Sequence, residues 1–127
     1  MIVVDTSALM AILQEEPGWE ACHNLLRSEP DILISAGTLT EALIVAGRRN
    51  IGQVMAGFVE GFGIKVIPVT AASARRAAEA YDKWGKGVHA PGLTFGDCFA
   101  YEVAKEHGCA LLFIGNDFSK TDIESAL

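Results

Sequence analysis

The sequence predicts an α/β fold, namely a three-layer α/β/α sandwich with a mainly parallel central sheet. Short runs that are apolar throughout alternate with amphipathic helical segments along the chain. Strands of that kind are typical of a parallel sheet that is covered on both faces. The 127 residues match the length of one ordinary domain and contain no repeat, linker or low-complexity tract. We therefore expect a single domain over residues 1–127.

Hydrophobic spacing places the elements in order. Residues 9, 12 and 13 share one helical face, residues 32–34 form a short apolar run, and residues 71–84 are rich in alanine and amphipathic. The expected elements are a strand over 2–4, helices over 7–13 and 19–26, a strand over 32–35, a helix from Thr38 to Arg48-Arg49, a helix over 50–62, a strand over 64–68, helices over 71–84 and 94–107, a strand over 110–114 and a short edge strand near Ile123.

The overall charge argues against a protein that coats itself in nucleic acid. Sixteen acids against ten bases give a net charge of -6. Residues 48–89 nevertheless carry seven of the bases and only three of the acids. This distribution allows a locally basic surface, although a solvated helix face with a Glu79–Lys83 pair explains it equally well.

The cysteines and the apolar runs indicate a cytoplasmic protein. Cys22, Cys98 and Cys109 are an odd number without CxxC spacing, so we expect reduced thiols. The apolar run before Asp5 is too short for a signal peptide, and no run reaches the length that spans a membrane.

Four acids from distant parts of the chain are the candidate site. Asp5 and Asp117 follow predicted strands, whereas Glu41 and Asp97 lie near the starts of predicted helices. The carboxyl ends of parallel strands and the starts of the helices that follow them meet at one edge of the sheet. Each acid also has an ordinary structural explanation: a helix cap for Asp5, capping boxes for Glu41 and Asp97, and an Asx turn for Asp117.

Carboxylates that converge in one pocket repel each other unless a cation lies between them. No lysine or arginine adjoins any of the four acids in sequence. An all-oxygen site suits Mg²⁺ or Mn²⁺, whereas zinc prefers His or Cys. Bound Mg²⁺ activates water and stabilises the oxygens of an in-line phosphoryl displacement. Thr6 and Ser7 beside Asp5, and Thr94 beside Asp97, are expected to orient the carboxylates or to cap the helices.

The chain resembles the PIN domain and, within it, the VapC-type toxins of bacterial toxin–antitoxin pairs. The resemblance rests on residues 3–9 (VVDTSAL), Thr40-Glu41, residues 93–101 (LTFGDCFAY) and residues 111–118 (LLFIGNDF), which occur in family order over nearly the whole chain.

The resemblance implies one PIN domain with a metal-dependent endoribonuclease activity. It implies that Asp5, Glu41, Asp97 and Asp117 take the acidic positions of the family and that the cofactor is Mg²⁺ or Mn²⁺. It further implies translation inhibition through cleavage of RNA, often tRNA or rRNA, a homodimer, and a small cognate antitoxin that occludes the site. The fourth acidic position varies most among subfamilies.

Other functions fit the residues less well. A phosphotransferase of the haloacid-dehalogenase type needs an acid at position 7, where this chain has Ser7, and there is no GxxxxGK[ST] loop. A receiver domain needs a phosphoacceptor Asp at the end of a middle strand, where this chain has Ser35 or Pro68. The non-enzymatic alternative is a catalytically silent PIN-like module that binds RNA or protein.

An RNA substrate requires basic groups beside the acids. The expected contacts are Arg48, Arg49, Lys83, Lys86 and His89. His89 as a general acid is weighed against an ordinary loop histidine, and Trp84 as a base-stacking platform against a core residue.

Overall fold

Four parallel strands form the central sheet of the computed structural model, which describes residues 1–127. The strands are β1 (Ile2–Val4), β2 (Ile32–Ser35), β3 (Lys65–Ile67) and β4 (Ala110–Leu112), in the order β3-β2-β1-β4. Ile2 pairs with Ile32 on one side and with Ala110 on the other, so β1 is a central strand. The predicted parallel α/β fold is confirmed.

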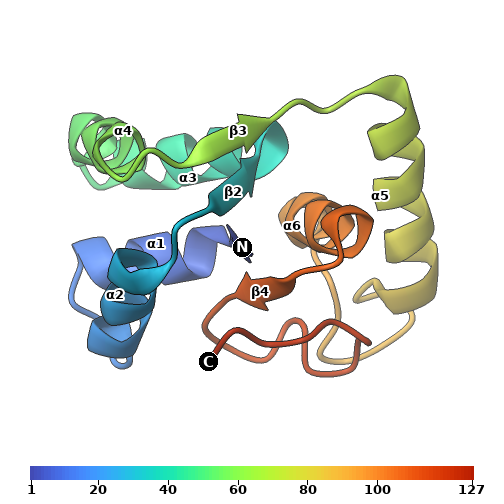
Figure 1. Ribbon diagram of the computed structural model, residues 1–127. Helices are drawn as coiled ribbons and strands as arrows, with labels where there is room; N and C mark the ends of the chain where they lie inside the picture. Colours follow the sequence, from blue (N-terminus) through green and yellow to red (C-terminus); the bar gives the residue numbers. More distant parts are fainter.

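Six helices cover the two faces of this sheet (Figure 1). The helices are α1 (Thr6–Leu13), α2 (Trp19–Ser28), α3 (Ala36–Arg48), α4 (Gly52–Gly61), α5 (Ala71–Trp84) and α6 (Phe95–His107). In Figure 1, α1 to α4 lie on the left of the sheet, and α5 and α6 lie on its right. None of the helices combines the length and the apolar character that a bilayer-spanning segment needs.

Alternating side chains of the strands divide the interior into two cores. Ile2, Val4 and Ile34 belong to the core under α1 to α4, whereas Val3 and Leu33 belong to the core under α5 and α6. Because successive residues of a strand point to opposite faces, each short apolar run supplies both layers.

Two predicted boundaries are wrong in ways that affect the site. The third helix begins at Ala36, not at Thr38, because the Ser35 side chain caps it by accepting a hydrogen bond from the Gly37 backbone N–H. Glu41 therefore lies in the second turn, and the predicted Thr38–Glu41 capping box does not form. The strand predicted over 110–114 ends at Leu112, so an irregular segment lies between β4 and Asp117.

The edges of the sheet also differ from the prediction. β3 is an edge strand whose Lys65 and Val66 are exposed, so it is not covered on both faces. The expected edge strand near Ile123 is reduced to one isolated bridge between Leu111 and Ser125.

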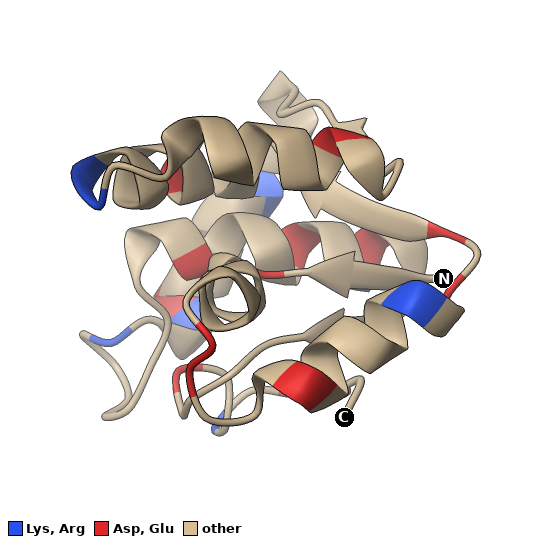
Figure 2. Cartoon of the chain, turned by 90° about the vertical axis from the view of Figure 1, so that its left-hand side faces the viewer, with Lys and Arg blue, Asp and Glu red and all other residues tan.

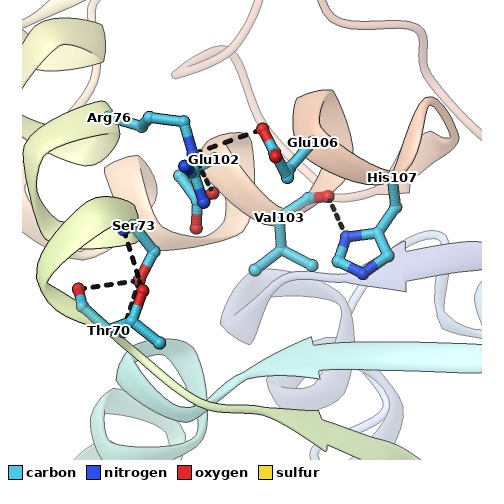
Figure 3. A network of polar contacts seen from close by, with 7 residues as sticks. All are labelled: Thr70, Ser73, Arg76, Glu102, Val103, Glu106 and His107. Atoms are coloured by element: carbon cyan, nitrogen blue, oxygen red, sulfur yellow. Dashed lines mark hydrogen bonds and ion pairs between the residues drawn. The ribbon is translucent and has the colours of Figure 1, made fainter.

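Polar contacts join α5 to α6 on the face of the sheet opposite α1 to α4 (Figure 3). The Arg76 guanidinium on α5 lies 3.0 Å from Glu102 and 3.2 Å from Glu106, both on α6. The capping box of Thr70 and Ser73 begins α5. Gly108, at φ 62°, ends α6 in a left-handed conformation that glycine adopts without strain. This attachment fixes α6, which carries Asp97.

Candidate active site

The four predicted acids line one pocket at the carboxyl edge of the sheet. Its volume is about 300 Å³, and its lining is Asp5, Thr6, Ser7, Glu41, Val45, Thr94, Asp97, Ile114, Asp117 and Phe118. The segments that supply these residues are far apart in sequence, and the parallel topology brings them to the same edge. No lysine or arginine lines this pocket.

Asp5 follows β1 and caps α1, so its structural and its predicted functional roles coincide. Its Oδ2 accepts hydrogen bonds from the Ser7 backbone N–H at 3.1 Å and from the Ser7 hydroxyl at 2.6 Å. Its Oδ1 is buried and has no hydrogen-bond partner. Burial raises the pKa of Asp5 to about 6 against the Ser7 hydrogen bonds, and the Glu41 carboxylate adds to the rise.

Glu41 reaches the pocket from α3 and is held by Thr6. The Thr6 hydroxyl donates to Glu41 Oε1 at 2.7 Å and also lies 3.3 Å from the Thr38 carbonyl oxygen. Of the two hydroxyls that were expected to orient the acids or to cap the helix, that of Ser7 bonds to Asp5 and that of Thr6 bonds to Glu41. One threonine therefore ties the start of α1 to the acid on α3.

Asp97 lies in the first turn of α6 and is 6% exposed. The Thr94 backbone N–H donates to Asp97 Oδ2 at 2.9 Å, which forms the predicted capping box. Burial raises the pKa of Asp97 to about 7 against the Thr94 hydrogen bond, and the nearby carboxylates of Asp5 and Asp117 raise it further. Without a cation, Asp97 is therefore only partly ionised near neutral pH.

Asp117 reaches the pocket from the irregular segment that follows β4. It is an exposed residue in a turn, and its carboxyl group lies close enough to that of Asp97 to share a hydrogen bond with it. The preceding strand end is tied to Asp5 through Ser7, because the Ile114 backbone N–H donates to the Ser7 hydroxyl at 3.0 Å.

The charges in this pocket have no counter-ion within the chain. The four ion pairs of the structure involve Glu29, Glu102, Glu106 and Asp122, and none of the pocket acids. A buried oxygen of Asp5 without a partner, beside three more carboxylates, is a donor set that fits a hard dication. The side chains do not form a ready coordination sphere, since no three acidic, His or Cys groups are arranged to hold an ion.

The expected RNA contacts are not gathered in one place. Arg48 lies about 10 Å along α3 from Glu41, seven residues on, and Arg49 donates to Gln14. His89 stacks on Trp84 with ring centroids 5.5 Å apart, and Lys83 lies over the same ring. Lys86 is connected to the acidic pocket, because it lines a hollow that shares Thr94 with that pocket. Figure 2 shows basic positions as separate spots among more numerous acidic ones, with no continuous basic band.

Gly96 is a site residue that the sequence reasoning missed. A Cβ at this position would collide with the Glu41 carboxylate, so any larger residue would push that carboxylate out of its position. The signal available in sequence was a glycine in the first turn of an otherwise regular helix, where it costs about 1 kcal/mol relative to alanine.

The chain is similar to known ribonucleases over nearly its whole length. The PIN domain profile matches residues 2–124. Ribonuclease VapC of Mycolicibacterium smegmatis is 37% identical over 125 residues, covering 96% of this chain and 97% of its own. Ribonuclease VapC30 of Mycobacterium tuberculosis is 38% identical and covers 96% of this chain and 95% of its own.

Solved structures share the fold. The Sarcin-Ricin loop cleaving toxin VapC20 of Mycobacterium tuberculosis matches with a TM-score of 0.79 and 22% identity, covering 97% of this chain and 96% of its own. A toxin–antitoxin complex from Klebsiella pneumoniae matches with a TM-score of 0.73 and 18% identity, covering 96% and 93%.

Proposed function

The chain belongs to the PIN-domain family, among its VapC-type toxins, and from this premise we propose that it is a Mg²⁺- or Mn²⁺-dependent endoribonuclease of a toxin–antitoxin pair. The observation that carries the proposal is the pocket itself, where four carboxylates meet without a cation from the chain. The alternative, a silent PIN-like binding module, gives no reason for the unpartnered buried oxygen of Asp5.

The metal would be held by Asp5, Asp97, Glu41 and Asp117. When bound, Mg²⁺ or Mn²⁺ supplies Lewis acidity at the scissile phosphodiester. Because the four side chains are not gathered into a coordination sphere in the protein alone, we expect small side-chain rotations on binding. Because Asp97 is only partly ionised near neutral pH, metal binding would release a proton from the fraction that is protonated.

The residues around the acids set their orientation. Ser7 fixes Oδ2 of Asp5, whose Oδ1 has no hydrogen-bond partner, and the Thr94 backbone N–H fixes Oδ2 of Asp97. Thr6 holds one oxygen of Glu41. Asp5, Glu41 and Asp97 are therefore each restrained through one oxygen, which limits the reorganisation needed for catalysis.

The proposed substrate is structured RNA, with tRNA and rRNA as the first classes to test. Lys86 is the proposed backbone contact beside the site, because its hollow meets the acidic pocket at Thr94. Arg48, Arg49, Lys83 and His89 are proposed as further contacts. Cleavage should weaken as salt rises, because phosphate contacts release counter-ions.

Two protein partners belong to the proposal. A cognate antitoxin would occlude the site, and the uncompensated negative charge there favours a cationic side chain in the occluding segment.

A second copy of the chain is the other proposed partner. Phe95 is 77% exposed beside a hollow of about 790 Å³ that Val69 and Phe99 help to line. A protruding ring next to an apolar hollow suits a two-fold contact, in which each copy fills the hollow of the other.

The test combines RNA cleavage with thermal melting of the purified chain. We expect cleavage that requires Mn²⁺, and a rise in the melting midpoint with Mn²⁺ because a ligand that binds only the folded state stabilises it. Asp5→Asn should lose both effects, whereas Asp31→Asn, at an exposed carboxylate before β2, should keep both. A wild-type protein without a Mn²⁺ shift would favour the silent binding module. Sequencing the ends of RNA cut in cells after induction identifies the target.

A further inference from the structure

Asp117 differs from the other three acids in how it reaches the pocket. Asp5, Glu41 and Asp97 stand at the starts of helices or within them, whereas Asp117 lies in the irregular segment 113–122. Its position therefore depends on what holds that segment. Phe118 is one anchor of this segment, because it is buried and its ring centroid lies 4.9 Å from that of Phe113.

A second anchor lies at the other end of the segment, at Asp122. Its Oδ1 accepts a hydrogen bond from the Tyr101 hydroxyl at 2.6 Å, and its Oδ2 accepts one from the Lys105 ammonium at 3.0 Å. Neither contact involves the acidic pocket. Although Asp122 is exposed, both oxygens of its carboxylate therefore accept a hydrogen bond from α6.

The donors lie on the same face of α6 as Asp97. Asp97, Tyr101 and Lys105 follow each other at intervals of four residues, which places them one above another along a helix. One face of α6 therefore carries both Asp97 and the two side chains that donate to Asp122.

Tyr101 also connects the opposite flank of the site. Its hydroxyl accepts a hydrogen bond from Trp84 Nε1 at 3.1 Å, at the end of α5. The Leu93 backbone N–H donates to the Trp84 carbonyl, so the loop between them closes just before Thr94, the residue that caps Asp97. A single buried hydroxyl thus joins the segment that carries Asp117 to the loop that leads to Asp97.

We propose that Tyr101 and Asp122 are positioning residues, a latch that holds segment 113–122 and keeps Asp117 in the pocket. The proposal rests on the proposed function, in which Asp117 contributes to metal binding. Residues that orient a metal ligand from outside the coordination sphere change metal affinity although they never touch the ion. The latch differs from a general stabiliser because the effect of Asp122 must pass through the segment that carries Asp117.

The test uses calorimetric Mn²⁺ binding together with amide hydrogen exchange. Tyr101→Phe keeps the ring and removes the hydroxyl, and Asp122→Ala removes the acceptor. We expect each to weaken Mn²⁺ binding about tenfold, to lower kcat for RNA with little change in KM, and to speed exchange of the Thr121 and Ile123 amides. Asp31→Ala, which removes an exposed carboxylate remote from the segment, should leave all three unchanged.

A double-mutant cycle separates the latch from general stabilisation. In an Asp117→Asn background, Asp122→Ala should weaken Mn²⁺ binding no further, because the residue through which Asp122 acts is already changed. An equal loss in both backgrounds, or wild-type affinity and exchange in both single variants, overturns the latch while the nuclease assignment stands. A wild-type chain that neither binds Mn²⁺ nor cleaves RNA overturns the proposed function and the latch with it.

Discussion

Gly96 is important to the site because it has no side chain. The Glu41 carboxylate occupies the space where a Cβ would lie. We therefore expect Gly96→Ala to displace Glu41 and to lower RNA cleavage by about tenfold or more, as the loss of a well-placed site group does. The measurement is cleavage rate at saturating Mn²⁺, with the folded state checked by circular dichroism.

The same substitution elsewhere provides the control for Gly96. Gly57 lies within α4, and a Cβ there meets no atom within 4 Å. Gly57→Ala should leave cleavage unchanged and stabilise the helix by about 0.5–1 kcal/mol. Unaltered cleavage by Gly96→Ala would show that the position of Glu41 is not required.

The buried acids make the metal-free protein sensitive to pH. The folded-state pKa values of Asp5, about 6, and Asp97, about 7, both lie above the ordinary value of 3.8. Between those values and 3.8 the folded state binds more protons than the unfolded state, so its stability increases as the pH falls from about 8 towards 5. Urea denaturation without metal should show this increase, and Asp97→Asn should flatten it. A wild-type protein that becomes steadily less stable over the same range would contradict the pKa shifts.

At the scale of single residues, the sequence identified the acids of the site but not all of the contacts that hold them. Asp5, Asp97 and the Thr94 capping box are local patterns, so spacing was enough to find them. The bond from Thr6 to Glu41 spans 35 positions, and the collision at Gly96 depends on how two helices cross. Neither can be read from neighbouring residues.

At the scale of elements, the attachment of α5 to α6 depends on Arg76. Glu102 is only 7% exposed, so removal of its partner leaves a buried charge without compensation. Arg76 itself is 39% exposed, so solvent reduces the effect. Arg76→Gln should lower the free energy of unfolding by roughly 1–2 kcal/mol in urea.

Arg75 is the matched control on the same helix. It is exposed and takes part in no ion pair, so Arg75→Gln should change stability by less than about 0.5 kcal/mol. Equal losses in the two variants would mean that net charge, and not the contact with Glu102, is responsible.

The sequence predicted helix α3 but misplaced its first residue. Ser35 is the last residue of β2 and also the cap of α3, so strand and helix join without a loop. Thr38 resembled a cap in sequence, but it is fully buried inside the helix. The difference arises from tertiary packing, which decides among several residues that are all suited to capping.

At the scale of the whole molecule, the parallel topology gathers the acids, and it leaves an apolar face open beside them. The order β3-β2-β1-β4 puts β1 and its Asp5 in the middle, with Glu41 and Asp117 arriving after the strands on either side. Sequence patterns predicted the parallel sheet, but not this order, because strand neighbours are set by long-range contacts. The open face beside Thr94 carries the exposed Phe95.

That face yields a prediction about assembly. Phe95→Glu places a charge where the proposed two-fold contact inserts a ring into the hollow, and burial of an unpaired charge is unfavourable. We expect the wild-type chain to sediment as a dimer and the variant as a monomer. The dissociation constant of the dimer should rise by on the order of tenfold or more. Val54→Glu, at a similarly exposed apolar position on α4, should remain dimeric. Because Phe95 precedes Gly96 and Asp97 in α6, Mn²⁺ binding by the monomeric variant must be measured alongside. Retained binding together with loss of the dimer assigns Phe95 to assembly, whereas a Phe95→Glu dimer indistinguishable from wild type places the two-fold contact on another face.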